Sequence, residues 1–385
     1  MAIQFPGQPG PTLGVEIELQ TIDLKTKELI PGAPKILSLN LDSEHVKKEL
    51  LQSNIEVNTP VCTHVSEVEK ELVSRIKTLI EVGREVGIGF ISAGTHPFSY
   101  WKTQPVTPDP RYYEQLERIR WSGYRLSTFG LHVHVGVESG EKAIAFMNVM
   151  SSYLPHLLAL SASSPFWDGV DTGLCSVRSK VFESLPGGGI PYRQRNWSSF
   201  QGLLKAFMKS GTIQSIQEIW WDIRPHLKYG TLEVRVCDAM SSIWELMGVV
   251  ALIQALVVWM DILYERGIFL DLPRHWVISE NKWRAARWGM DCRLITDNKG
   301  SQLHIRTVLE DLLEELEGVS KMLGTFPYLT RIEEILRNFG SSYRQRQIYQ
   351  RYRKGKEVVS FLERELYDSL GDGKHTRPPQ KDLQG

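Results

Sequence analysis

Four short segments of the chain carry glutamate, histidine or arginine at every second position. They are Leu13–Gln20 (LGVEIELQ), Asn54–Asn58 (NIEVN), Leu131–Val137 (LHVHVGV) and Thr231–Val236 (TLEVRV). Side chains alternate across a β-strand, so each segment would have one aliphatic face and one polar face. The polar faces together hold Glu16, Glu18, Glu56, His132, His134, Glu233 and Arg235. Carboxylates that share one surface repel one another unless cations lie between them. The pattern therefore predicts a divalent-metal site and, with it, a phosphorylated ligand.

The ligand types favour one class of metal. Glutamate oxygens suit Mg²⁺ or Mn²⁺, whereas a zinc site would require further histidine or cysteine ligands. None of the other histidines has the spacing of a ligand. The His132–His134 pair alone also fits a metal-dependent hydrolase, and that alternative stays open. Glu49, which lies seven residues before Glu56, is a weaker candidate ligand.

Three arginines are candidates for anion binding. Arg235 follows Glu233 by two positions, where a guanidinium beside metal-bound carboxylates would suit the terminal phosphate of a nucleotide. The alternative is a plain Glu233–Arg235 salt bridge. Arg224 is a possible second anion contact, and Arg178 precedes a glycine-rich segment, LPGGGIP (185–191), that lacks the pattern of a P-loop.

The elements that would position these residues follow from periodicity. Apolar residues recur with a helical period from Val65 to about Val86, and a short buried strand is expected over Gly89–Gly94. Further helices are expected over Arg111–Arg120, Glu141–Leu160, Trp197–Trp221, Ser242–Glu265, Asn281–Trp288, Leu303–Leu323, Arg331–Asn338 and Tyr343–Leu370, and mostly loop over Ser163–Ile190. The pattern predicts an α+β fold in one catalytic domain, residues 1–370, that is sheet-rich over 12–240 and helical over 241–370. The polar segment 371–385 is expected to be a disordered tail.

Composition excludes several function classes. Lysine plus arginine equals aspartate plus glutamate, 45 each, so no net field would attract nucleic acid or an anionic membrane. Cys62, Cys175, Cys237 and Cys292 lie far apart, which fits a reducing cytoplasm. The most apolar run, Leu246–Met260, is shorter than the ~20 residues that span a bilayer. We expect it to be a buried helix, and an exposed face on it would indicate a subunit interface, such as that of a homodimer.

The order of these motifs resembles that of a known family. GVEIE, EVNTPVC, GLHVHVG, SPFWDGVDTG, GTLEVRVCDA and ENKWRAARWG follow one another as in the YbdK-like carboxylate–amine ligases. These form the second type of glutamate–cysteine ligase, within the glutamine synthetase-like superfamily. The similarity covers roughly residues 12 to 370. One departure is Ile17, which stands where the family commonly has a second glutamate, and alternation places it on the apolar face.

The resemblance implies a mainly antiparallel half-barrel backed by helices, with ATP and two or three Mg²⁺ ions in its concavity. It implies that Glu16, Glu56, His132 and Glu233 are metal ligands, with Glu18 beside them and Glu49 matched by spacing alone. It places His134 and Arg235 near the nucleotide. Arg178 and Arg224, which come from the sequence pattern alone, are further candidates for nucleotide binding, and Arg235 and Glu18 are the catalytic candidates. The expected reaction joins the γ-carboxylate of L-glutamate to L-cysteine or another amine through an acyl phosphate. A nucleotide-binding protein of this fold without turnover is a further alternative.

Overall fold

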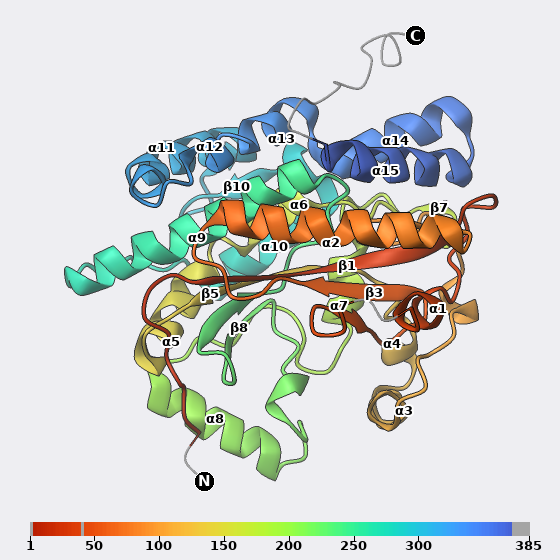
Figure 1. The fold of residues 1–385 in the computed structure, drawn as a ribbon. Helices are drawn as coiled ribbons and strands as arrows, with labels where there is room; N and C mark the ends of the chain where they lie inside the picture. Colours follow the sequence, from red (N-terminus) through yellow and green to blue (C-terminus); the bar gives the residue numbers. More distant parts are fainter. Residues whose placement is uncertain (1–2, 40–41, 372–385) are drawn as a thin grey trace.

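The computed structural model describes residues 3–39 and 42–371. Its centre is a seven-stranded antiparallel sheet in the order β2-β3-β1-β5-β9-β8, with β4 paired to the far end of β1 (Figure 1). The strands of this sheet are β1 (Leu13–Asp23), β2 (Val46–Lys48), β3 (Asn54–Asn58), β4 (Ile88–Ile91), β5 (Leu131–Gly136), β8 (Ile223–His226) and β9 (Thr231–Val234). Two small hairpins pair β6 (Phe166–Trp167) with β7 (Val170–Asp171) and β10 (Arg293–Ile295) with β11 (Gln302–His304). All four predicted metal-site segments are strands, and they are joined in one sheet.

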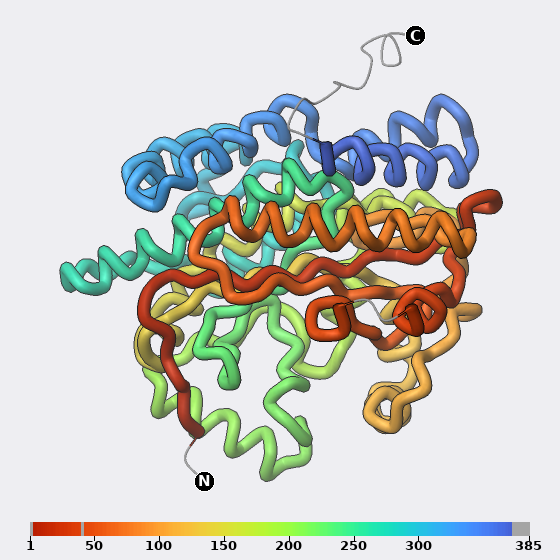
Figure 2. Tube along the Cα trace, viewed as in Figure 1, coloured from red at the N-terminus to blue at the C-terminus, as the bar shows by residue number. Residues whose placement is uncertain are grey.

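Helices cover one face of this sheet. Val15, Ile17 and Leu19 of β1 point into a core that they share with α2 (Val65–Glu85) and α9 (Ile243–Glu265). The tube in Figure 2 shows α2 lying along the sheet, with the C-terminal helices forming a further layer beyond it. The remaining helices are α1 (Ala33–Leu37), α3 (Pro110–Ile119), α4 (Trp121–Tyr124), α5 (Gly140–Met150), α6 (Leu154–Ser161), α7 (Val177–Glu183), α8 (Trp197–Lys209), α10 (His275–Trp288), α11 (Ile305–Met322), α12 (Phe326–Leu329), α13 (Ile332–Asn338), α14 (Gly340–Tyr352) and α15 (Gly355–Ser369).

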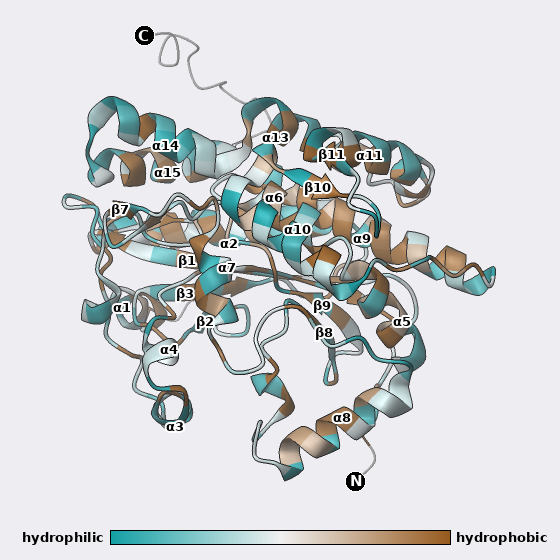
Figure 3. Ribbon diagram, turned by 180° about the vertical axis from the view of Figure 1, so that it is seen from behind, coloured by the Kyte–Doolittle hydropathy of each residue, from teal (hydrophilic) through white to brown (hydrophobic). Residues whose placement is uncertain are grey.

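Helix α9 is the central helix of the core. By length and composition it could cross a membrane, but 83% of its apolar window is buried inside the molecule. It is longer than the apolar run that the sequence marked, because the helix continues to Glu265. In Figure 3 apolar residues run along α9, whereas α14 is largely hydrophilic. The burial of α9 on nearly every side agrees with the expectation of a buried helix.

The structure corrects several predicted boundaries. The helix expected over Glu141–Leu160 is two helices, α5 and α6, bent by 65° at a break that precedes Pro155. The helix expected to reach Trp221 ends at Lys209, since Gly211 takes a left-handed φ of +74°. The C-terminal helix is interrupted between α14 and α15, where Arg353 has φ 55°. Pro155, Gly211 and Gly355 lie at or beside these breaks, but the predicted helices continued through them.

Two further expectations concern the predicted loop over Ser163–Ile190 and the predicted C-terminal tail. Ser163–Ile190, expected to be mostly loop, contains α7, which carries Arg178. Apart from Gly371, the expected disordered tail over 371–385 lies outside the described residues.

Candidate active site

The polar face of the sheet forms the floor of a deep cleft. The cleft has a cavity volume of about 320 Å³. Cavities of roughly 300–1,000 Å³ are typical of small-molecule binding sites. The outer walls come from α3 and from the segment that precedes β8, through residues such as Tyr112, Gln217 and Trp220. These wall residues were not singled out from the sequence, because no motif marks them.

Strand register brings the predicted residues into adjacent rows. Glu18 lies opposite Glu56 across β1 and β3, and Glu16 lies opposite His132 across β1 and β5. The next row runs from His134 to Glu233 and on to Arg224, across β5, β9 and β8. Alternation had placed these side chains, other than Arg224, on the polar faces of the predicted strands. The antiparallel register makes all of them neighbours.

One group of possible metal ligands consists of Glu16, His134 and Glu233. Their ligand atoms all lie within 4.8 Å of one another. Burial alone would raise the pKa of Glu16, but hydrogen bonds and attraction from His132 and His134 hold it well below its usual range. The sequence had placed His132, rather than His134, among the ligands. In the structure His132 Nδ1 lies 3.2 Å from Glu16 Oε2, so both histidines contact the same carboxylate. The role of each histidine stays a prediction.

The second group consists of Glu18, Glu49 and Glu56, again with ligand atoms within 4.8 Å of one another. Burial raises the pKa of Glu18 to about 7, against the attraction of Arg178 and with repulsion from Glu56. Burial, together with repulsion from Glu56 and Glu18, raises the pKa of Glu49 well above its usual range. Glu49, the weakest candidate from the sequence, therefore joins the cluster. Three carboxylates at this separation fit a hard divalent cation, which would remove their mutual repulsion.

Three arginines border the ligand groups. Arg224 donates to Glu233 from Nε at 2.7 Å and from Nη2 at 3.3 Å, and its Nη1 donates to the carbonyls of Gln217 and Ile219. Arg235 follows the end of β9 and also donates to Glu233. Despite its burial, Glu233 has a pKa held well below the usual range, because both guanidinium groups attract its charge. The salt bridge between Glu233 and Arg235 that the sequence offered as an alternative is thus present.

The arginines differ in how many of their donors are already used. Arg224 and Arg235 both line the cleft. Arg224 uses four hydrogen bonds to brace the sheet edge, whereas the buried Nε of Arg235 has no partner among the described residues. Arg178, on α7, also lines the cleft and is 3% exposed. Arg235 and Arg178 therefore have donors left for an anionic ligand, and Arg224 is chiefly a support for Glu233.

Comparison with known proteins identifies the family of the chain. The profile of glutamate–cysteine ligase family 2 matches residues 12–365. The chain belongs to this family. It is 43% identical over 369 residues to a Gloeobacter violaceus protein named "Putative glutamate–cysteine ligase 2", with 94% of this chain and 99% of the relative covered. A protein of the same name from Thermobifida fusca is 42% identical over 373 residues, covering 95% and 93% of the two chains. The chain is accordingly an enzyme of the ligase class.

Solved structures show the fold of the family. The crystal structure of the Francisella tularensis glutamate–cysteine ligase in complex with AMP superposes with a TM-score of 0.69 at 12% identity, covering 99% of this chain and 92% of that one. A bifunctional glutathione synthetase from Pasteurella multocida superposes with a TM-score of 0.66 at 13% identity, covering 94% of this chain and 52% of that one. The predicted α+β class, with an antiparallel glutamine synthetase-like sheet backed by helices, is confirmed.

Proposed function

We propose that the chain uses ATP to join an amino-acid carboxylate to an amine, forming an amide bond. The observation that carries this proposal is the pairing of two three-residue ligand groups with buried arginines on one cleft floor. Such a floor suits a nucleotide triphosphate with divalent cations. The complex of the Francisella neighbour with AMP supports a nucleotide as one ligand.

The residues present fit Mg²⁺ or Mn²⁺. Glu16, His134 and Glu233 would hold one ion and Glu18, Glu49 and Glu56 a second, with His132 as a further ligand or as a support for Glu16. When bound, the metal ions supply positive charge that neutralises the phosphates. Their oxygen-rich environment favours this reading over a zinc hydrolase, because the groups together contain a single histidine.

The reaction needs no side-chain nucleophile. A carboxylate oxygen of the acid substrate bonds to the γ-phosphorus of ATP as the bond from that phosphorus to the β,γ-bridging oxygen breaks, which gives an acyl phosphate and ADP. The amine nitrogen then bonds to the acyl carbon, phosphate leaves with the C–O bond electrons, and the amine loses a proton. Arg235 and Arg178 would bind phosphate oxygens, with Arg224 holding Glu233 in place. Glu18, a member of the second ligand group, is the candidate catalytic carboxylate.

The substrates follow from the family. L-Glutamate, through its γ-carboxylate, is the proposed acid, and L-cysteine or another amino acid is the proposed amine, in keeping with the names of the relatives. We propose a cytoplasmic enzyme, supported by four free, buried cysteines. We also propose that residues 1–370 act as one catalytic domain, because one apolar cluster includes both Leu13 and Leu370. A homodimer, and the absence of nucleic-acid or membrane partners, remain proposals from composition.

A phosphate-release assay tests the proposed reaction. Purified protein with Mg²⁺ and ATP should release phosphate when L-glutamate and an amine are both present, and much less when either is omitted. Product mass should equal the sum of the two substrates minus water. Hydrolysis of a substrate without ATP would support the zinc-hydrolase alternative. ATP binding without turnover for any acid–amine pair would support the alternative of a non-catalytic member.

A further inference from the structure

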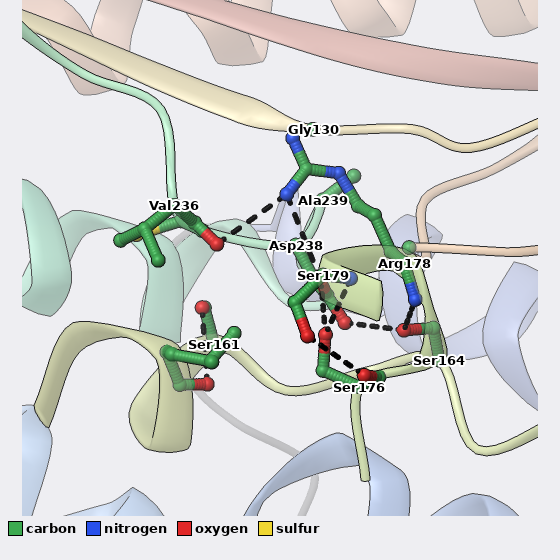
Figure 4. Close-up of polar contacts among 12 residues, drawn as sticks. Gly130, Ser161, Ser164, Ser176, Arg178, Ser179, Val236, Asp238 and Ala239 are labelled. Carbon is green, nitrogen blue, oxygen red and sulfur yellow. Dashed lines mark hydrogen bonds and ion pairs between the residues drawn. The ribbon is translucent and has the colours of Figure 1, made fainter. Parts of the chain in front are cut away.

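Asp238 is a fully buried carboxylate that the proposed chemistry does not use. It follows β9 and is 0% exposed. Its Oδ2 accepts hydrogen bonds from the Ser163 backbone N–H at 3.0 Å and from Ser164 Oγ at 2.6 Å, and its Oδ1 accepts from Ser176 Oγ at 2.8 Å. These contacts join β9 to the start of α7 (Figure 4). A buried carboxylate with this many partners is held in a single position.

The same contacts fix the helix that carries Arg178. Ser176 is the N-cap of α7, where its hydroxyl also accepts from the Ser179 backbone N–H at 3.3 Å. Ser164 Oγ, which donates to Asp238, accepts from the Arg178 backbone N–H at 3.2 Å. Asp238 therefore holds the N-cap residue of α7 through the Ser176 hydroxyl, and the backbone of Arg178 through the Ser164 hydroxyl.

The guanidinium of Arg178 is confined as well. Nη1 donates to the Val236 carbonyl at 3.3 Å and lies 3.8 Å from Asp238 Oδ1 (Figure 4). Nη2 donates to the Arg235 carbonyl at 3.2 Å. The guanidinium also lies against Gly130, where a Cβ would lie 2.3 Å from Nη2. A glycine at this position is thus what lets the arginine reach the floor of the cleft.

One hydrogen-bond donor of Arg178 has no partner among the described residues. Its Nε is buried and has no hydrogen-bond partner among the described residues, while the side chain lines the cleft. Arg178 Nη2 also donates to the carbonyl of Arg235, a second cleft arginine whose Nε has no partner among the described residues. Arg178 and the backbone of Arg235 therefore belong to one hydrogen-bonded network that includes Asp238.

We propose that Asp238 is a positioning residue: through Ser164 and Ser176 it sets α7 so that Arg178 meets the phosphates of the bound nucleotide. The inference rests on the proposed function for the identity of the ligand. Asp238 does not touch the ligand and acts through Arg178. Its contribution to catalysis should accordingly depend on the presence of Arg178.

A double-mutant cycle tests this dependence. We would compare Asp238→Asn, Arg178→Ala and the double variant with the wild-type enzyme, measuring kcat/KM for ATP at saturating acid and amine. Arg178→Ala should lower kcat/KM for ATP at least about tenfold, as expected for a lost charge-assisted hydrogen bond. Asp238→Asn should have a comparable effect, and the double variant should be little worse than Arg178→Ala alone. KM for the amine should change less than KM for ATP.

Matched controls separate positioning from loss of stability. Glu245→Gln alters another buried carboxylate, which pairs with Arg344 away from the cleft, and Ser139→Ala removes the N-cap of α5. Both should lower the melting temperature and leave kcat/KM within about twofold. Ser176→Ala keeps the charge of Asp238. It should lower kcat/KM when Arg178 is present and have little effect in the Arg178→Ala background. If Asp238→Asn does not fold, Ser176→Ala replaces it in the cycle.

The outcomes are distinct. Losses that multiply in the double variant, or an Asp238→Asn enzyme with normal kcat/KM, would overturn the inference and leave the proposed function standing. Wild-type protein without ATP-dependent ligation would overturn the proposed function, and with it the ligand assigned to Arg178. A fall in kcat/KM on Asp238→Asn that disappears in the Arg178→Ala background would support the positioning role.

Discussion

Glu56 and Glu233 both lie on the cleft floor, but the charges around them are opposite. Glu56 lies among carboxylates, where burial and repulsion from Glu16 raise its pKa. Glu233 lies between two arginines. The substitutions Glu56→Gln and Glu233→Gln should each lower turnover by about a hundredfold or more if each removes a metal ligand. The kinetic loss alone does not distinguish these two environments.

Stability without metal distinguishes them. In EDTA, Glu56→Gln should melt at the wild-type temperature or above it, because like-charge repulsion falls. Glu233→Gln should lose about 3 kcal/mol, since two buried guanidinium groups lose their counter-charge. Denaturant unfolding in EDTA measures both, with the exposed Glu317→Gln on α11 as the control. A Glu233→Gln protein as stable as wild type would contradict the pairing described for this site.

Arg235 and Arg224 make the second residue-scale comparison. Arg235→Lys keeps the charge but loses the planar fork, so kcat should fall at least about tenfold while KM for ATP changes less. Arg224→Lys should mainly lower stability, because its donors already bind Glu233 and two carbonyls. Steady-state kinetics with varied ATP, together with melting curves, measure both effects. Unchanged kcat in Arg235→Lys would remove this residue from the phosphate contacts.

The raised pKa of Glu18 gives a pH-dependent prediction. Its value of about 7 exceeds the ordinary 4.5, so the folded protein binds more protons at this site than the unfolded chain between these limits. The free energy of unfolding from this group therefore falls as pH rises from about 4.5 to about 7. In EDTA, Glu18→Gln should gain stability over wild type across this range, by up to about 3 kcal/mol at the upper end.

The difference in free energy of unfolding between Glu18→Gln and wild type cancels the contribution of the buried histidines, which both proteins share. His132, whose pKa burial and Arg235 lower to about 4, destabilises the folded state as pH falls, which is the opposite trend. Saturating Mg²⁺ at pH 8 should abolish or reverse the advantage of Glu18→Gln, since a cation favours the ionised carboxylate. A stability difference that does not vary between pH 5 and 8 would show that Glu18 is not strained by burial.

At the scale of elements, strand β1 determines which side chains reach the cleft. Ile17 is 0% exposed and packs in the core, between two glutamates that point the other way. Ile17→Glu restores the residue that the family commonly has, but here it buries an unpaired carboxylate. We expect a loss of several kcal/mol and no gain in activity. Ile17→Val, the size control, should cost about 1 kcal/mol, and a more active Ile17→Glu enzyme would show that the register of β1 differs.

At the scale of the whole molecule, Lys282 connects the helical C-terminal part to the cleft. It lies on α10, is 2% exposed, and forms ion pairs with Asp222 and with Glu183 at the end of α7. Lys282→Met would leave these carboxylates without their shared buried cation. We expect the free energy of unfolding to fall by about 3–5 kcal/mol, measured with urea. Arg284→Met, two residues further along α10 and paired with the more exposed Glu280, should cost under about 1 kcal/mol.

This connection also explains the two motifs whose role the sequence did not disclose. The backbone of Asp222 accepts from Arg235 and donates to the Gly189 carbonyl of the LPGGGIP segment. The ENKWRAARWG helix thereby supports, through Lys282 and Asp222, the glycine-rich segment and the backbone of Arg235. The buried Lys282 of this helix thus forms its ion pairs beside the cleft.

The sequence by itself determined which residues share a face. Alternation is a local property of an extended chain, so it separated Glu16 and Glu18 from Ile17, and His132 and His134 from Val133, before any partner strand was known. The amphipathic period of α2 likewise identified its buried side. Motif order carried the family. Alternation and the amphipathic period depend on neighbours a few residues apart, which is why they could be read directly from the sequence.

Tertiary structure decided which of these residues meet. The registers of β1 with β3 and of β5 with β9 bring Glu18 to Glu56 and His134 to Glu233, and no local pattern specifies them. Glu49 joins its cluster, and Asp238 reaches the cap of α7, through contacts between segments distant in the chain. Breaks within helical periods, such as that between α5 and α6, also escaped the pattern. Distances between side chains depend on strand pairing and packing, and these are set by the whole fold rather than by spacing along the sequence.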